Sequence, residues 1–284
     1  MNHIAVLGAG TMGHGIAQVA AGAFPSVSLY DLGQDEVNAG LARIRQNLDK
    51  GVDRGKVTTD ERARCLSALK GTTSLADAVA SADLVIEAAP EVMDLKRQIF
   101  SEVARHAPRD ALLASNTSSL SITEIATSLP RPERFIGLHF FNPVHIMALV
   151  EVVRGADTSD ETLSLALAFA RAIGKEPVVV RDSPGFASSR LGIALGLEAI
   201  RMVEEDVASP QDIDKAMELG YRHPMGPLRL TDLVGLDVRL GIAEYLHETL
   251  GSEAFRPPEL LRQMVAAGRL GKKSGRGFYD WTAD

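Results

Sequence analysis

The N-terminal segment constrains the fold more than any other part of the chain. It reads HIAVLGAGTMGHGIAQVAA, which is a short β-rich run from His3 to Leu7 followed by a helical pattern. Gly8, Gly10 and Gly13 lie between the two in G-x-G-x-x-G spacing. In this context the glycines permit a tight turn, the approach of a pyrophosphate to the backbone, and close packing of helix on strand. The segment therefore predicts a dinucleotide-binding turn with the anion at the helix N-terminus.

A second strand candidate, SVSLYD, ends at Asp31 and bears on the choice of cofactor. An acidic residue at this position of a dinucleotide-binding unit bonds the adenosine ribose hydroxyls and repels a 2′-phosphate. We therefore expect NAD rather than NADP, with Thr11 and Met12 of the glycine turn also contacting it. The alternative is that Asp31 is only a turn residue after the strand.

Further strand candidates alternate with helical patterns along the first part of the chain. They cover residues 84–88, 111–114, 134–139, 149–153 and 177–180, with helical patterns between many of them, notably at 91–106 and 158–173. Such alternation is typical of a mostly parallel, doubly wound sheet. We expect an α/β fold in which residues 1–182 form a Rossmann-type NAD-binding domain.

Polar residues follow two of these strand candidates. The stretches EAAPE and SNTSS come directly after strands, and ligands of doubly wound sheets bind at the carboxyl ends of strands. Glu91 and Asn116 are therefore expected to face the cofactor. NTSS also contains good helix N-cap residues, a role that is compatible with a functional one.

Two helical stretches, roughly 34–50 and 59–69, exceed what a simple crossover needs. They predict an inserted helical hairpin at about 34–69, whose tip carries Lys50, Arg54 and Lys56. This basic run is either solvated surface or a contact to a phosphate-rich substrate.

From residue 183 onward the patterns are helical throughout. Ser183 and Pro184 indicate a helix start with serine as N-cap, and helices are expected at 184–206, 210–219, 226–235, 236–250 and 257–268. Residues 183–284 thus predict an all-helical substrate-binding domain. Its surplus apolar surface favours a homodimer.

The composition excludes several classes of protein. The chain is 45% hydrophobic with a net charge of −7, which argues against a general nucleic-acid or anionic-membrane binder. No apolar run approaches the length of a bilayer span, and the N-terminus lacks signal-peptide features, so we expect a cytoplasmic protein. The single cysteine, Cys65, lies in a helical pattern and is expected to be structural.

One acid lies where acids are rare. Glu151 interrupts the apolar run of GLHFFNPVHIMALVEVV, and a buried charge is costly unless it is paired. His139 ends the preceding strand candidate. If the two strands lie side by side, Glu151 reaches the imidazole.

Several motifs together resemble the short 3-hydroxyacyl-CoA dehydrogenases, especially the bacterial 3-hydroxybutyryl-CoA dehydrogenases. They are GAGTMGHGIA, SNTSSLSITEIA, GLHFFNPV, LVEVV, DSPGF and GKKSGRGFYDW, and they span nearly the whole chain. The resemblance implies NAD-dependent oxidation of a short (3S)-3-hydroxyacyl-CoA, or the reverse reduction. No metal is expected.

The resemblance also implies roles for individual residues. His139 would be the catalytic base, Glu151 its partner and Ser118 the catalytic serine. Nicotinamide-side contacts fall on Glu91, Lys96, Asn142 and Lys273, and the nearest matches to the CoA-binding residues are Arg54 and Lys56.

Three features depart from the family pattern, one of which is EAAPE, a mild variant of the usual acid-bearing stretch. Ser189 stands where asparagine is usual and is expected to assist catalysis, while His145 and Ala148 stand where members often carry proline and lysine. Two other functions stay open from the sequence: a dehydrogenase of a free hydroxy acid and a non-catalytic NAD(H) sensor.

Overall fold

The computed structural model describes residues 1–282 and divides into two compact units. The chain passes from the first unit to the second between Ser183 and Pro184. No helix among residues 1–282 is both long enough and apolar enough to cross a bilayer.

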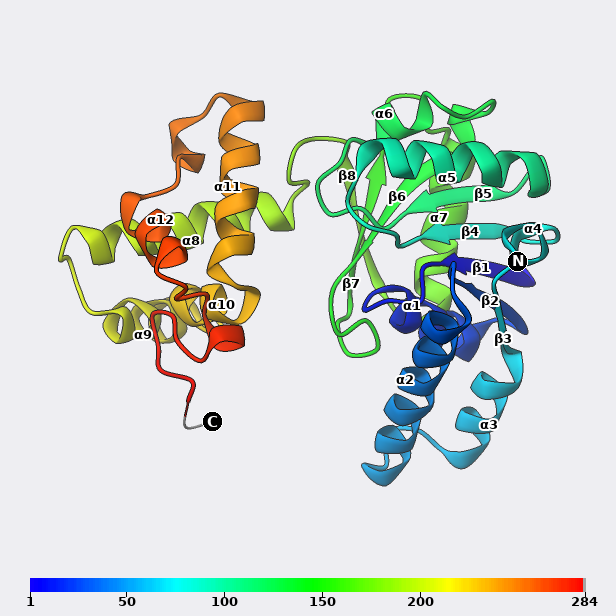
Figure 1. The fold of residues 1–284 in the computed structure, drawn as a ribbon, viewed down its shortest axis with the longest axis horizontal. Helices are drawn as coiled ribbons and strands as arrows, with labels where there is room; N and C mark the ends of the chain where they lie inside the picture. The colour runs from blue at the N-terminus through cyan, green and yellow to red at the C-terminus, as the bar shows by residue number, and fades with distance from the viewer. Residues whose placement is uncertain (283–284) are drawn as a thin grey trace. The chain divides into compact units, whose positions relative to one another are not determined.

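The first unit is built on an eight-stranded sheet with the order β3-β2-β1-β4-β5-β6-β7-β8 (Figure 1). All neighbouring strands are parallel except β6 and β7, which are antiparallel. The predicted doubly wound Rossmann-type sheet is therefore confirmed. Its strands are β1 (His3–Leu7), β2 (Ser26–Tyr30), β3 (Leu69–Thr72), β4 (Leu84–Glu87), β5 (Leu112–Ser115), β6 (Phe135–Phe140), β7 (Leu149–Arg154) and β8 (Glu176–Arg181).

Strand β3 corrects the sequence interpretation, which placed Leu69 at the end of a helix. Leu69 instead pairs with Val27 of β2, and the ladder continues to Thr72. Gly71 lets this strand lie close to the helix that packs on it. A β-carbon at Gly71 would lie 2.5 Å from a methyl group of Val37, so only glycine lets the helix above this edge pack so closely.

Helices cover both faces of the sheet. On one face, α1 (Gly13–Ala23), α2 (Gln34–Asp53), α3 (Thr59–Ala68) and α7 (Asp160–Ala172) share a single apolar cluster with the strands, and the rings of Phe24 and Phe169 stack within it at 5.6 Å. On the other face lie α4 (Leu75–Val79), α5 (Met93–His106) and α6 (Ile122–Ala126), where Phe100 packs edge-on against Phe135 at 4.7 Å.

Helices α2 and α3 form the predicted hairpin, which projects beyond the sheet (Figure 1). Helix α3 begins with a capping box in which Thr58 and Glu61 satisfy each other's backbone N–H groups. An ion pair between Arg62 and Asp49, 2.5 Å long, ties the two helices together.

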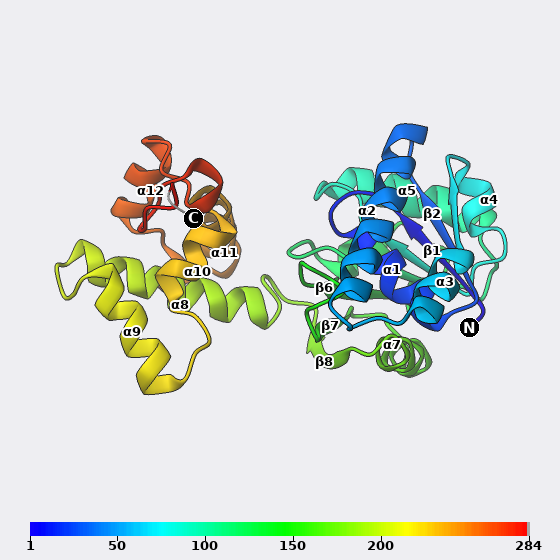
Figure 2. The same cartoon turned by 90° about the horizontal axis from the view of Figure 1, so that it is seen from below.

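The second unit is helical, as predicted, and its helices gather around one apolar cluster (Figure 2). The helices are α8 (Ser188–Glu204), α9 (Pro210–Tyr221), α10 (Pro227–Val234), α11 (Leu236–Leu250) and α12 (Glu259–Ala266). The predicted helix start at Ser183 and Pro184 is wrong. Gly185 and Phe186 have φ of +74° and +48°, which a right-handed helix cannot accommodate, so α8 begins only at Ser188.

A buried carboxylate fastens the last described residues to this unit. Asp232 accepts hydrogen bonds from the backbone N–H groups of Phe278 and Tyr279 and from the indole of Trp281. Since a β-carbon at Gly277 would lie 2.1 Å from the same carboxylate, this glycine lets the chain pass close to Asp232.

Candidate active site

The glycine turn after β1 has the geometry that a dinucleotide requires. Gly8 has φ of +101°, and a β-carbon at Gly13 would lie 1.7 Å from the carbonyl oxygen of Gly8. A β-carbon at Gly10 would meet nothing within 4 Å, so the backbone there is open to a ligand. The turn and the N-terminus of α1 together fit the pyrophosphate of NAD.

Asp31 lies directly after β2 and supports this turn. Its Oδ2 accepts a hydrogen bond of 2.7 Å from the backbone N–H of Ala9, and its Oδ1 accepts one of 2.8 Å from Leu32. The carboxylate therefore holds the backbone of the glycine turn in place. A carboxylate oxygen accepts more than one bond, so this support leaves capacity for a ribose hydroxyl.

A buried ion pair lies under the carboxyl end of β4. Lys96 of α5 is 1% exposed, and its Nζ donates to Glu87 Oε1 at 2.6 Å and to the carbonyl of Ala89 at 3.3 Å. Glu87 is itself fully buried and also accepts a 2.6 Å bond from the hydroxyl of Ser115. Glu87 is a functional-site residue beyond those predicted from the sequence, although it shares with Glu151 the signal of an acid inside an apolar strand.

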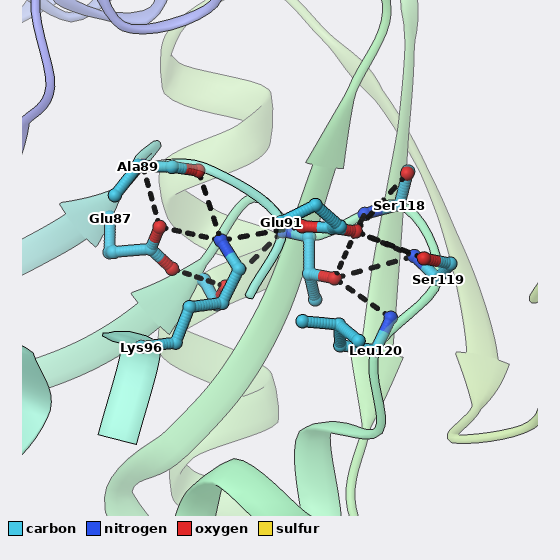
Figure 3. A network of polar contacts seen from close by, with 9 residues as sticks. Glu87, Ala89, Glu91, Lys96, Ser118, Ser119 and Leu120 are labelled. Carbon is cyan, nitrogen blue, oxygen red and sulfur yellow. Dashed lines mark hydrogen bonds and ion pairs between the residues drawn. The ribbon is translucent and has the colours of Figure 1, made fainter. Parts of the chain in front are cut away.

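Glu91 continues this network to the loop after β5 (Figure 3). Its Oε2 lies 3.4 Å from Lys96 Nζ, and its Oε1 accepts bonds from the hydroxyl of Thr117 and from the backbone N–H groups of Ser118 and Ser119. Burial opposes ionisation of Glu91, but the bond from Thr117 and the charge of Lys96 outweigh it and lower its pKa. One ionised carboxylate thus shapes the NTSS loop and leaves the Ser118 side chain exposed.

Asn116 joins the ends of two strands. Its side-chain Oδ1 accepts a 2.9 Å hydrogen bond from the backbone N–H of Phe140, the last residue of β6. The bond holds the end of β6, where His139 lies, against the loop after β5. Asn142, which follows β6, is exposed.

His139 and Glu151 are direct cross-strand neighbours in the antiparallel β6–β7 ladder. The Nδ1 of His139 lies 2.8 Å from Oε2 of Glu151, so the adjacency expected from the sequence is present. The glutamate is 1% exposed and the histidine 7%. A carboxylate accepts from Nδ1–H, which selects the tautomer with Nε2 as the proton-accepting nitrogen.

A hollow of about 670 Å³ opens beneath the α2–α3 hairpin. Its lining includes all three residues of the predicted basic tip, Lys50, Arg54 and Lys56, and also Arg64 of α3. The loop between β6 and β7 closes another side through His145 and Ile146. The hollow therefore connects the basic hairpin with the loop that follows the His139 strand.

Comparison with known protein families identifies the family of this chain. The model of the 3-hydroxyacyl-CoA dehydrogenase NAD-binding domain matches residues 3–183, and that of the C-terminal domain of the same family matches residues 185–281. The chain is a member of the 3-hydroxyacyl-CoA dehydrogenase family. It is thus an NAD-dependent oxidoreductase, as the sequence motifs predicted.

Similar proteins match the dehydrogenase over nearly its whole length. A protein of Bacillus subtilis named "Probable 3-hydroxybutyryl-CoA dehydrogenase" is 48% identical, over 99% of this chain and 98% of its own. The 3-hydroxybutyryl-CoA dehydrogenase of Bradyrhizobium diazoefficiens is 45% identical, over 98% and 94%. The crystal structure of (S)-3-hydroxybutyryl-CoA dehydrogenase from Ralstonia eutropha is 43% identical and superposes with a TM-score of 0.95, over 99% of each chain.

Two predicted site residues belong to the second unit of the dehydrogenase. Ser189 lies in the first turn of α8. Lys273 pairs with Asp237 of α11 at 2.5 Å, and the bond from Lys273 lowers the pKa of that carboxyl. Their roles toward substrate and cofactor stay predictions.

Proposed function

We propose that this dehydrogenase oxidises the 3-hydroxyl group of a short (3S)-3-hydroxyacyl-CoA, such as 3-hydroxybutyryl-CoA, and catalyses the reverse reduction. The observation that carries the proposal is the buried His139–Glu151 pair. Relatives that cover the whole chain and are named for 3-hydroxybutyryl-CoA support the substrate.

When bound, NAD supplies the hydride acceptor for the carbon that loses its hydrogen. Gly8, Gly10 and Gly13 hold its pyrophosphate, with Thr11 and Met12 beside them. Asp31 bonds the ribose, and Asn116 and Asn142 lie toward the nicotinamide end.

His139 moves the proton of the reaction. Its Nε2 takes the proton from the substrate 3-hydroxyl as the hydride leaves C3, and the hydroxyl becomes a carbonyl. Glu151 stabilises the imidazolium that forms, because it accepts the Nδ1–H bond and carries the opposite charge. The imidazole can take up a proton and return it, which suits transfer in both directions.

Ser118 donates its hydroxyl to the oxygen that becomes the carbonyl. In the structure its backbone N–H and its hydroxyl both donate to Glu91 Oε1, at 2.8 and 3.2 Å, so the hydroxyl turns from Glu91 to the substrate oxygen when substrate binds. Lys96 is enclosed by protein and acts through Glu91, which makes it a positioning residue.

Arg54 and Lys56 bind the phosphates of CoA through charge-assisted hydrogen bonds in the hollow under the hairpin. Alanine at both positions should raise the KM for acetoacetyl-CoA and leave NADH binding unchanged. A matched control is Arg43→Ala with Arg45→Ala, which removes two exposed charges from the same α2 helix outside the hollow.

A steady-state screen of NADH oxidation tests the substrate. Acetoacetyl-CoA should give a higher kcat/KM than longer 3-ketoacyl-CoAs and a far higher value than free acetoacetate. Preference for free acetoacetate would instead identify a dehydrogenase of free hydroxy acids. Tight NADH binding with no turnover of any of these compounds would identify an NAD(H) sensor.

We further propose a homodimer through the α9–α10 surface of the second unit. Leu219 and Tyr221 at the end of α9 are 73% and 77% exposed, and Leu230, Leu233 and Val234 of α10 are also exposed. The two helices pack against each other, and exposed apolar side chains on neighbouring helices favour a subunit interface. Leu219→Glu with Leu233→Glu should shift the mass measured by light scattering from dimer to monomer, whereas Val207→Asp, at an exposed residue before α9, should not.

A further inference from the structure

The hollow under the hairpin has one feature that the basic tip does not explain. His145 lines it, at a position where the sequence motifs of this family often carry proline. Proline has no side-chain donor, whereas an imidazolium donates from both ring nitrogens. This chain therefore places an additional titratable group in the hollow.

The loop that carries His145 is fixed from inside the protein. Lys175 is 6% exposed, and its ammonium donates to the backbone carbonyls of Val144 and Met147 at 2.5 and 2.6 Å, on either side of the histidine. The backbone N–H groups of Ile146 and Met147 both donate to the carbonyl of Pro143. The loop is thus a compact turn that holds the His145 backbone at the rim of the hollow.

The groups that face His145 are mostly cationic. His14 on α1 and Lys175 lie close enough to act on it electrostatically. The hairpin contributes Lys50, Arg54, Lys56 and Arg64, and one acid, Glu61. The Glu61 carboxylate is occupied by the Thr58 N–H and hydroxyl in the capping box. Partial burial, then His14 and Lys175, lower the pKa of His145 below its usual value.

We propose that His145 binds a phosphate group of the CoA nucleotide as an imidazolium and takes up its proton when the acyl-CoA binds. The inference rests on the proposed acyl-CoA substrate and goes beyond it, because it makes substrate affinity depend on pH through a residue remote from the chemistry. In the free enzyme partial burial, together with the cationic surroundings, favours the neutral ring. A phosphate in the hollow reverses this preference.

Thermodynamic linkage fixes the sign of the effect. The pKa of His145 is low in the free enzyme and is raised by the bound phosphate, so between these two values binding takes up a proton. Acyl-CoA affinity therefore rises as pH falls through this range. A gain of about tenfold corresponds to about 1.4 kcal/mol, within what a charge-assisted hydrogen bond supplies.

The test compares three variants of the whole enzyme at saturating NADH. His145→Pro restores the residue that is frequent in the family, and His145→Gln keeps a donor that does not titrate. His106→Gln is the matched control, because His106 is exposed on α5 and pairs with Glu102 there. KM values for acetoacetyl-CoA, its 3′-dephospho analogue and acetoacetyl-pantetheine are measured between about pH 6 and pH 8, near the imidazole pKa.

Wild type and the His106→Gln variant should bind acetoacetyl-CoA about tenfold more tightly at the lower pH, as one protonation allows. Both His145 variants should show a much smaller change. The 3′-phosphate itself titrates near pH 6, so the difference between wild type and variant is the readout. Acetoacetyl-pantetheine should show no such difference, and the dephospho analogue distinguishes the 3′-phosphate from the pyrophosphate.

Two outcomes would overturn the inference. One is an equal pH dependence of KM in wild type and both His145 variants. The other is an equal effect of His145→Gln on acetoacetyl-pantetheine, which has no phosphate. The Arg54→Ala, Lys56→Ala double variant separates this failure from failure of the proposed substrate site. If the double variant raises the KM for acetoacetyl-CoA while the His145 variants keep the wild-type pH dependence, the hollow still binds the acyl-CoA and only the proton uptake is refuted.

Discussion

The carboxylate of Glu151 lies 2.8 Å from Nδ1 of His139, directly opposite it in the only antiparallel pair of the sheet as described over residues 1–282. Both side chains are buried, so water competes little for the bond. The pair is rigid because each partner is fixed by a strand. Substitution of either residue therefore tests how much the pair contributes to catalysis.

Replacing the base should remove turnover and spare the cofactor site. His139→Gln is expected to lower kcat by about 10²-fold or more, since general base catalysis contributes about that much. NADH affinity, measured by fluorescence titration, should stay at the wild-type value because the glycine turn is unchanged. A variant with near-normal kcat would show that another group takes the proton.

Glu151→Gln should leave the fold intact and reduce kcat strongly, because a neutral amide cannot stabilise the imidazolium. The pH profile of kcat/KM should lose or shift the limb that reports His139. Thermal unfolding provides the control. A purely structural pair would instead lower the melting temperature and leave the remaining folded enzyme fully active.

The charge of Asp31 should determine the preference for NADH over NADPH. Its carboxylate oxygen should hold the glycine turn in shape. Asp31→Asn keeps an acceptor for the Ala9 N–H but loses the charge, so it should narrow the preference for NADH over NADPH at little cost to NADH affinity. Asp31→Ala should also weaken NADH binding. Equal kcat/KM for NADPH and NADH in the wild type would contradict the assignment.

The Glu87–Lys96 pair should matter for stability more than for binding. Lys96→Met leaves the Glu87 carboxylate buried without its ammonium partner, which typically costs about 3–5 kcal/mol. Adding Glu87→Leu should recover part of that loss, because apolar residues often replace buried pairs without cost, whereas the Ser115 hydroxyl and the Ala89 N–H lose their acceptor. Urea unfolding of the two variants measures both effects. If Lys96→Met is as stable as wild type, another group stabilises the charge of Glu87.

Cys65 should behave as an inert thiol. It is 2% exposed, and burial raises its pKa to about 11, so almost no thiolate forms at neutral pH. Labelling with a thiol reagent should therefore be slow in the native enzyme and fast after unfolding. Rapid labelling of the native enzyme would show that the region around α1 and α3 opens readily.

The sequence predicts this fold well where a local pattern and a chemical need agree. The glycine turn follows from spacing alone, and the His139–Glu151 adjacency follows from the cost of burying an acid in an apolar strand. Glu87 carries the same signal, but its partner Lys96 comes from a helix rather than from a neighbouring strand, so strand pairing does not predict the contact.

Two failures have a backbone cause. Ser183 and Pro184 form a good N-cap pattern, yet the positive φ of Gly185 and Phe186 delays α8 to Ser188. Strand β3 is short and lies at the edge of the sheet, so its few residues show no alternation that marks a strand. Tertiary pairing with β2, rather than local preference, decides its conformation.

The antiparallel register of β6 and β7 also determines which insertions and deletions the enzyme can accept during evolution or engineering. Side chains alternate between the two faces of a sheet, so one residue lost between Leu149 and Glu151 would turn the carboxylate away from His139. A change of length in the connecting loop would leave both strands in register. Length variation between related enzymes should therefore avoid the first half of β7.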